Sequence, residues 1–336
     1  MNNKSYNANF VVVFEATSDK ILETLQASAG EVRLLPSGII IKGIGGFYYV
    51  SSEDDGIYEC KARGLFRKME LTPLTGDRVI FSVTDRQLKK GYIEEICERS
   101  TVLIRPAAAN VDQIIAVVAA RSPEPDLLLL DKILVTAEKK GIDAVVCINK
   151  IDLDTGKSRT ELCSSYIRAG YSVIETSSEE AAGFSLLKEA LSGHISVFAG
   201  QSGVGKSTLL NRVMETVVME TGSISGKIDR GRHTTRHAEL MKLSGGGYVV
   251  DTPGFSSYEL SEIKYDELQY LFPEFAEHIP ECRFTGCSHV NETDCEVKRA
   301  VDTGLISKGR YLRFVELYNI LKLEDDLKYR KGNRRG

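Results

Sequence analysis

The stretch "GQSGVGKS", residues 200–207, decides the fold class of this chain. It fits G-x-x-x-x-G-K-S in full, follows the strand-like run "ISVFA" (195–199) and opens the helix-like run "STLLNRVM" (207–214). The glycines of such a loop let backbone N–H groups converge on phosphate oxygens, and the helix N-terminus adds partial positive charge. Strand, loop and helix in this order predict a P-loop nucleotide-binding domain, with Lys206 at the β- and γ-phosphates and the Ser207 hydroxyl on Mg²⁺.

A second piece of the expected phosphate site is "YVVDTPG", residues 248–254. Asp251 ends a hydrophobic strand, where its carboxylate can hold Mg²⁺ through water, and Gly254 can offer its backbone N–H to the γ-phosphate. The next residue, Phe255, stands where many GTPases place a glutamine that orients the attacking water. Phenylalanine forms no hydrogen bond through its side chain, so another group must orient that water.

The stretch "GRHTTRHAEL", residues 231–240, lies between these two pieces. A threonine here would complete the Mg²⁺ shell, and either Thr234 or Thr235 fits, with Thr235 favoured. His233 is the candidate catalytic residue, because a neutral imidazole can accept a proton from water or orient it. The alternative is an ordinary surface loop with a surface histidine.

The stretch "VVCINKID", residues 145–152, resembles a loop that reads guanine. The Asp152 carboxylate can accept hydrogen bonds from guanine N1–H and the 2-amino group, which adenine lacks. Asn149 can address the purine edge, and the stem of Lys150 can cover the ring. The next strand ends in "ETSS" (175–178), whose backbone N–H groups can meet guanine O6. The expected guanine contacts are therefore Asn149, Lys150, Asp152, Ser177 and Ser178.

The base-reading loop precedes the phosphate loop, which reverses the usual order of a GTPase. Strand–helix units can meet in space whatever their chain order, so a circular permutation keeps the site intact. A P-loop ATPase or kinase is the rival interpretation, but it gives no role to "NKID" or "ETSS". The sequence therefore favours a circularly permuted GTPase domain of the α/β class.

The loop "CRFTGCSHVNETDC", residues 282–295, has the spacing C-x4-C-x-H-x5-C. Three thiolates and an imidazole form a closed tetrahedral Zn²⁺ set, which favours a structural over a catalytic metal. The alternative is a loop of reduced cysteines with a chance histidine. The predicted zinc ligands are Cys282, Cys287, His289 and Cys295.

The flanking segments suggest separate modules. Residues 38–104 read as short strands broken by Gly, Asp and Pro, typical of a small barrel or sandwich. Within them "KARGLFRK" (61–68) interleaves four cations with Phe66, which suits RNA phosphates and a stacked base, or else is a solvated hairpin loop. From 264 the pattern is helical, and the tail "KYRKGNRRG" (328–336) is either a polyanion contact or a solvated terminus.

Composition limits the other possibilities. The chain has 336 residues, 42% of them hydrophobic, and a net charge of −4, so any nucleic-acid surface must be local. It has no apolar run of about 18 residues and no secretory signal at its start. We therefore expect a cytoplasmic monomer without a membrane partner.

The order NKID, GxSGVGKS, GRHTT, DTPG and then the cysteine loop resembles the RsgA (YjeQ/YloQ) family of circularly permuted GTPases, which assist maturation of the small ribosomal subunit. The resemblance spans roughly residues 38–325 and includes "GDRV" and "RPAAANVDQ". It implies phosphate contacts from Gly200, Gln201, Ser202, Gly203, Val204, Gly205, Lys206, Ser207 and Thr208.

The same resemblance implies a division of the chain and a partner. The expected parts are an unassigned N-terminal extension (1–37), an OB-fold β-barrel (38–104), the permuted GTPase domain (105–263) and a helical zinc module with a basic tail (264–336). The implied partner is the small subunit and its rRNA near the decoding region, with GTP hydrolysis stimulated by the subunit and GTP/GDP state coupled to binding. The alternative function is a GTP-binding RNA or ribosome adaptor with negligible turnover.

Overall fold

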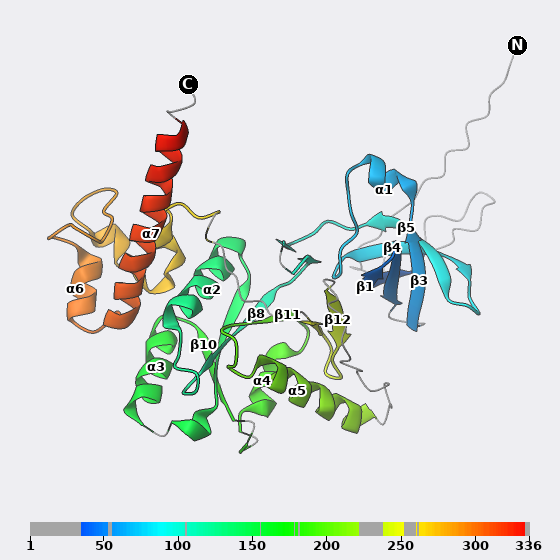
Figure 1. The fold of residues 1–336 in the computed structure, drawn as a ribbon, viewed down its shortest axis with the longest axis horizontal. Helices are drawn as coiled ribbons and strands as arrows, with labels where there is room; N and C mark the ends of the chain where they lie inside the picture. The colour runs from blue at the N-terminus through cyan, green and yellow to red at the C-terminus, as the bar shows by residue number, and fades with distance from the viewer. Residues whose placement is uncertain are drawn as a thin grey trace, which may run out of the picture. The chain divides into compact units, whose positions relative to one another are not determined.

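The structure is a computed structural model that describes residues 35–52, 56–104, 106–154, 156–177, 179–180, 182–221, 238–251, 260 and 262–332. Residues 35–336 are one structural unit, in which strands of a barrel, an α/β sheet and a helical segment follow one another along the chain (Figure 1). The expected N-terminal extension therefore lies almost wholly outside the described residues. Among the helices that are described, none is long and apolar enough to cross a membrane.

Five short strands close into the predicted barrel. They are ordered β1-β2-β3-β5-β4, and β4 returns to pair with β1. Alternate residues such as Ile40, Val50, Tyr58 and Phe81 point inward and form a buried core. The strands are β1 (Ser37–Ile44), β2 (Phe47–Ser52), β3 (Gly56–Ala62), β4 (Arg78–Asp85) and β5 (Lys90–Ile96). This five-stranded closure confirms the OB-like barrel.

The stretch 61–68 differs from the expected hairpin loop. It ends β3 and then forms the short helix α1 (Gly64–Lys68). Phe66 is only 6% exposed and belongs to the barrel core with Val79 and Phe81, so the prediction that its ring could stack a base is wrong. The reason is that the helix turns its one buried residue inward and leaves its other side chains to solvent.

Six further strands continue the barrel strands into one 11-stranded sheet, which is joined by the antiparallel pairing of β12 with β1. The order of the six is β10-β9-β8-β11-β13-β12, with β12 antiparallel and the others parallel. The strands are β8 (Gln113–Ala119), β9 (Asp143–Asn149), β10 (Ser172–Thr176), β11 (Ile195–Ala199), β12 (Glu239–Lys242) and β13 (Tyr248–Asp251), preceded by the short pair β6 (Val102–Leu103) and β7 (Ala108–Ala109). Because the carboxyl ends of parallel strands meet at one edge, the loops after β9, β10 and β11 and the end of β13 gather there despite their permuted order.

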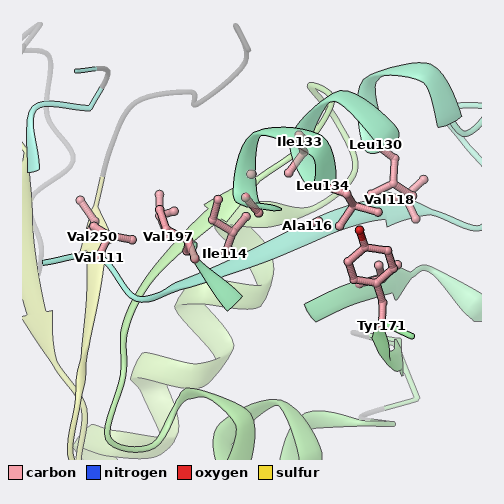
Figure 2. Close-up of a cluster of buried hydrophobic side chains, with 14 of the residues drawn as sticks. Val111, Ile114, Ala116, Val118, Leu130, Ile133, Leu134, Tyr171, Val197 and Val250 are labelled. Atoms are coloured by element: carbon pink, nitrogen blue, oxygen red, sulfur yellow. The ribbon is translucent and has the colours of Figure 1, made fainter. Parts of the chain in front are cut away.

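Helices cover both faces of this six-stranded part, which is why its central strands are continuous apolar runs. On one face α2 and α3 pack on residues such as Ala116 and Val118 of β8; Figure 2 shows Leu130, Ile133 and Leu134 of α2 beside them. On the other face α4 and α5 pack on the intervening residues of the same strands. The helices are α2 (Leu127–Lys140), α3 (Lys157–Arg168), α4 (Phe184–Leu191) and α5 (Lys206–Thr221), and the single turn η1 (Ile151–Leu153) follows β9.

The C-terminal segment is helical, as predicted. A buried aromatic cluster of Phe272, Phe275 and Phe314 forms its core together with Cys287 and Cys295. The same core includes Val135 of α2, so the segment packs against this helix of the α/β part. Its elements are η2 (Leu268–Leu271), η3 (Pro273–Phe275), η4 (Ile279–Glu281), α6 (Glu296–Asp302) and α7 (Lys308–Gly332).

Candidate nucleotide site and metal cluster

The predicted phosphate loop joins β11 to α5, and its glycines are required by close approaches. Gly200 has φ +141°, and a Cβ there would lie 2.0 Å from the carbonyl oxygen of Val117. Gly205 has φ +99°, and a Cβ there would lie 2.3 Å from Nδ2 of Asn149. Both are contacts that no side chain can make. The loop backbone is therefore held tightly against β8 and the base-reading loop, which leaves its amides free of side-chain cover.

Lys206 lies folded over this loop. Its Nζ donates hydrogen bonds to the carbonyl oxygens of Gly200 at 2.6 Å and Gln201 at 2.8 Å. Burial lowers the pKa of Lys206 from its ordinary value. Ser207 and Thr208 are exposed in the first turn of α5, where their hydroxyls are accessible to a phosphate or a cation.

The base-reading loop contacts the phosphate loop directly. Lys150 adopts the left-handed conformation (φ +61°), and its Nζ donates to the carbonyl oxygen of Gly203 at 2.8 Å. Nδ2 of Asn149 donates to the carbonyl oxygen of Val204 at 2.8 Å, and its side chain is buried. Sequence reasoning placed Asn149 and Lys150 on the purine. The structure shows that both join two loops that are far apart in the chain.

Two contacting residues of this region were missed by sequence reasoning. The Thr176 hydroxyl, buried at the end of β10, donates to Oδ1 of Asn149 at 3.0 Å and so orients its amide. The carbonyl oxygen of Ser122 accepts a second hydrogen bond from Lys150 Nζ at 2.5 Å. The contact of Thr176 could have been anticipated, because a threonine ends the strand just before Ser177. Nothing in the local sequence indicates that the Ser122 carbonyl contacts Lys150.

Asp152 and Ser177, two of the expected guanine contacts, lie side by side. The Ser177 hydroxyl donates to Oδ1 of Asp152 at 2.5 Å, and Asp152 is half-buried. The Ser177 hydroxyl thereby restrains the carboxylate that the sequence assigns to the guanine base.

Asp251 is the last residue of β13. Val250, one residue earlier, pairs with Val197 of β11, so Asp251 and the phosphate loop leave the sheet at the same edge. Five other predicted site residues lie outside the described part of the chain. They are Ser178, His233, Thr234, Thr235 and Gly254.

The four predicted metal ligands come together. The donor atoms of Cys282, Cys287, His289 and Cys295 all lie within 4.8 Å of one another. His289 Nδ1 is 3.6 Å from Cys282 Sγ and 3.3 Å from Cys295 Sγ, and the two sulfurs are 3.9 Å apart. A tetrahedral zinc with ordinary bond lengths would separate its ligand atoms by about 3.5–3.8 Å. The cluster therefore fits a metal ion of this size.

The surroundings of the cluster orient His289. Its Nε2 lies 2.7 Å from Oε1 of Gln269, which leaves Nδ1 to face the sulfurs. The amide of Gln269 is itself held, because its Nε2 donates to the carbonyl oxygen of Asp266 at 3.1 Å. The Tyr311 hydroxyl donates to the carbonyl oxygen of His289 at 2.8 Å. Such outer contacts fix the ring orientation of a metal-binding histidine.

The ionisation of the cluster predicts its pH behaviour. Burial raises the pKa of Cys287 to about 12 and also raises that of Cys295. Burial lowers the pKa of His289, which keeps the imidazole neutral at pH 7. A metal must therefore displace thiol protons on binding, and its affinity should fall as the pH falls.

Comparison with known proteins gives consistent matches over both folded parts. The family model described as "RsgA GTPase" matches residues 96–261, and that described as "RsgA N-terminal domain" matches residues 37–93. A protein of Ruminiclostridium cellulolyticum named "Small ribosomal subunit biogenesis GTPase RsgA" is 55% identical over 88% of this chain and 96% of its own length. One of the same name from Alkaliphilus metalliredigens is 48% identical over 86% of this chain and 98% of its own length.

Two solved structures have the same fold. The structure titled YjeQ from Thermotoga maritima has a TM-score of 0.73 and 39% identity, and covers 86% of this chain and 99% of its own. The structure titled "YloQ, a circularly permuted GTPase" has a TM-score of 0.73 and 39% identity, and covers 89% of this chain and 99% of its own. The permutation inferred from the loop order is thus a property of the closely similar folds.

Proposed function

The chain belongs to the RsgA family of circularly permuted GTPases and is a GTP hydrolase, and from this premise we propose that it binds the small ribosomal subunit and assists its late maturation. The partner is taken from the name that its relatives carry, "Small ribosomal subunit biogenesis GTPase RsgA". The state of the nucleotide, GTP or GDP, would be coupled to binding and release of the subunit.

One observation carries the nucleotide assignment. Asn149 and Lys150 bind the backbone of Val204 and Gly203, so the base-reading loop and the phosphate loop face one ligand. Asp152, held by Ser177, is the carboxylate that we propose for guanine recognition. Adenine would leave this carboxylate unpaired, and such a mismatch rejects the wrong base strongly.

The proposed chemistry uses the carboxyl edge of the sheet. Ser207 and Asp251 would hold Mg²⁺ together with Thr235 or its neighbour Thr234, and the ion would neutralise charge on the β- and γ-phosphates. Lys206 would stabilise the same charge. We propose His233 as the group that orients or deprotonates the attacking water. The isolated protein should then turn over slowly and be stimulated by the subunit.

Several further assignments belong to the same proposal. The ion of the Cys3His cluster is zinc in a structural role, supported by the donor spacing and the closed ligand set. The barrel contacts rRNA, the chain acts as a monomer, and a role in subunit biogenesis places it in the cytoplasm. The boundaries 1–37, 38–104, 105–263 and 264–336 are proposed as the limits of its parts.

Sedimentation with purified small subunits tests this function. We expect the chain to co-sediment with a non-hydrolysable GTP analogue and to be released with GDP, and phosphate release to rise when subunits are added. Binding without any phosphate release would favour the adaptor alternative. Absence of binding in both nucleotide states would refute the proposal.

A further inference from the structure

Strand β12 lies between the proposed Mg²⁺ ligand Asp251 and the barrel. On one side it pairs antiparallel with β13, and Glu239 of β12 stands directly opposite Asp251. On the other side it pairs antiparallel with β1, and Glu239 stands opposite Lys42. Directly paired residues of neighbouring strands point to the same face of a sheet. Lys42, Glu239 and Asp251 therefore form one row across three strands.

This row faces the helix that begins at the phosphate loop. Val250 belongs to the core that α2 and α3 cover, and Val249 belongs to the core that α4 and α5 cover. Because side chains alternate along a strand, Asp251 and its partner Glu239 point to the face of α4 and α5. Ser207, which is proposed to bind the same Mg²⁺, lies in the first turn of α5. The row therefore ends on the Mg²⁺ side of the nucleotide site.

The barrel end of the row is an ion pair. Nζ of Lys42 lies 2.9 Å from Oε2 of Glu239. Like charges that stand directly opposite on paired strands destabilise the pairing, and Glu239 and Asp251 are such a pair. A cation on Glu239 offsets this repulsion. Lys42 of the barrel therefore favours the position of Asp251 at the end of β13.

A second barrel residue holds the start of β12. The Thr75 hydroxyl donates to the carbonyl oxygen of Ala238 at 3.0 Å, and Thr75 is only 7% exposed. The turn that carries Thr75 is bound to β1, because the backbone N–H of Gly76 donates to the carbonyl oxygen of Ile40 at 2.7 Å. Ile40 lies two residues before Lys42. Both barrel contacts to β12 therefore come from one hydrogen-bonded part of the barrel.

We propose that Lys42 and Thr75 are positioning residues for the Mg²⁺ side of the nucleotide site and act through β12. Together with their partners Ala238 and Glu239 they form the barrel–β12 junction. The inference rests on the proposed function, because it takes Asp251 as a ligand of the Mg²⁺ that bridges the β- and γ-phosphates. It goes further in making the barrel a support of the nucleotide site. Since linkage is reciprocal, Mg²⁺ and nucleotide must in turn favour this pairing of β1 with β12.

The gain in affinity that Mg²⁺ gives to a non-hydrolysable GTP analogue tests the barrel–β12 junction. This gain is the ratio of the dissociation constants in EDTA and in Mg²⁺, measured by titration of the full chain. Thr75→Val removes the hydroxyl, and the gain should fall about three- to tenfold, the range of one hydrogen bond. Lys42→Met leaves Glu239 unneutralised beside Asp251, and the gain should fall about two- to fivefold, the range of one exposed ion pair.

Conservative variants separate positioning from a general loss of structure. Thr75→Ser keeps the hydroxyl and Lys42→Arg keeps the cation, so both should retain the gain of the parent. Arg63→Met is the matched control, because Arg63 and Glu94 form an ion pair at 2.6 Å within the barrel that does not involve β12. It should leave the gain unchanged. Affinity in EDTA should be the same in every variant, because the row acts only on the Mg²⁺ side.

The inference is overturned if Thr75→Val and Lys42→Met both keep the gain of the parent, or if their affinity in EDTA falls as much as that in Mg²⁺. Failure of the proposed function gives different results. If the parent itself gains no affinity from Mg²⁺, the proposed Mg²⁺ site is wrong and the inference falls with it. If subunits neither bind nor stimulate, the proposed function fails, and the Mg²⁺ titration still decides the role of the barrel–β12 junction.

Discussion

Replacing Arg310 with methionine should loosen the C-terminal segment from the α/β sheet. Arg310 of α7 is 1% exposed and lies between Asp131 of α2 and Glu274 of η3. One terminal nitrogen donates to Asp131 Oδ1 at 2.7 Å, and Nε and the other terminal nitrogen both donate to Glu274. The guanidinium also lies 5.0 Å from the centroid of the Phe272 ring. Burial by itself would lower the pKa of Arg310, but Asp131 and Glu274 more than offset this and raise it.

The expected cost follows from what each carboxylate keeps in the Arg310→Met variant. Asp131 retains Arg313 and the Tyr166 hydroxyl, which donates to it at 2.9 Å. Glu274, 5% exposed, loses the cation that neutralises it. Breaking a buried ion pair from one side costs about 3–5 kcal/mol, and because Asp131 stays paired we expect about 3 kcal/mol. Adding Glu274→Met removes the stranded charge, so the double variant should regain about 1–2 kcal/mol.

Thermal unfolding followed by far-UV circular dichroism measures this effect, since the chain has no tryptophan. A loss of about 3 kcal/mol should lower the midpoint by about 6–12 °C. Lys139→Met is the matched control, because Lys139 also joins α2 to the C-terminal segment through Glu267 at 2.6 Å. Unlike Arg310 and Glu274, both of these side chains are more than a third exposed, at 35% and 39%. Lys139→Met should leave the unfolding midpoint close to that of the parent, because an exposed ion pair contributes little to stability. The reasoning is refuted if Arg310→Met melts like the parent, or if the double variant is less stable than the single one.

Four other outcomes are expected. Asp152→Asn should lose guanine preference by about 2–4 kcal/mol and bind xanthosine triphosphate relatively better, as measured by competition; unchanged GTP affinity would contradict the base assignment. Cys287→Ser should lower the metal content found by elemental analysis and the stability of the C-terminal segment, while nucleotide affinity persists. Gln269→Leu keeps all four metal ligands but removes the hydrogen-bond acceptor beside the His289 imidazole. Competition with a chelator should therefore show an affinity for the metal ion about 10–100-fold weaker, and lower pH should weaken the metal affinity further. His233→Ala should abolish most of the stimulation by small subunits but not GTP or subunit binding; a variant stimulated as well as the parent would remove His233 from the mechanism.

Much of the fold was predictable because its signals are local. The strand-like run 195–199 matches β11, and the helix-like run 207–214 lies within α5, since the apolar pattern of each run is a property of that segment alone. The glycines of 200–207 predict a loop whose backbone lies too close to its neighbours for a side chain. Gly200 and Gly205 confirm this, because a Cβ at either residue would clash with a neighbouring atom. The C-x4-C-x-H-x5-C spacing likewise keeps all four metal ligands within one short loop. In each case the interacting groups are close in the chain, so residue type and spacing are sufficient.

The tertiary structure decided the features that depend on which distant segments meet. Asn149 and Lys150 bind the phosphate-loop backbone because β9 and β11 both flank β8, which no local pattern states. Arg310 is buried against α2 only because α7 packs on that helix.

The barrel shows the same limit for a single ring. Alternation along β3 separates two faces, but it does not say which one the closed barrel encloses, nor that α1 would turn Phe66 inward while Tyr92 stays outside. A period of two is symmetric between the faces of an isolated strand. Strand pairing and closure remove that symmetry, and they are formed by hydrogen bonds between residues that are remote in the sequence.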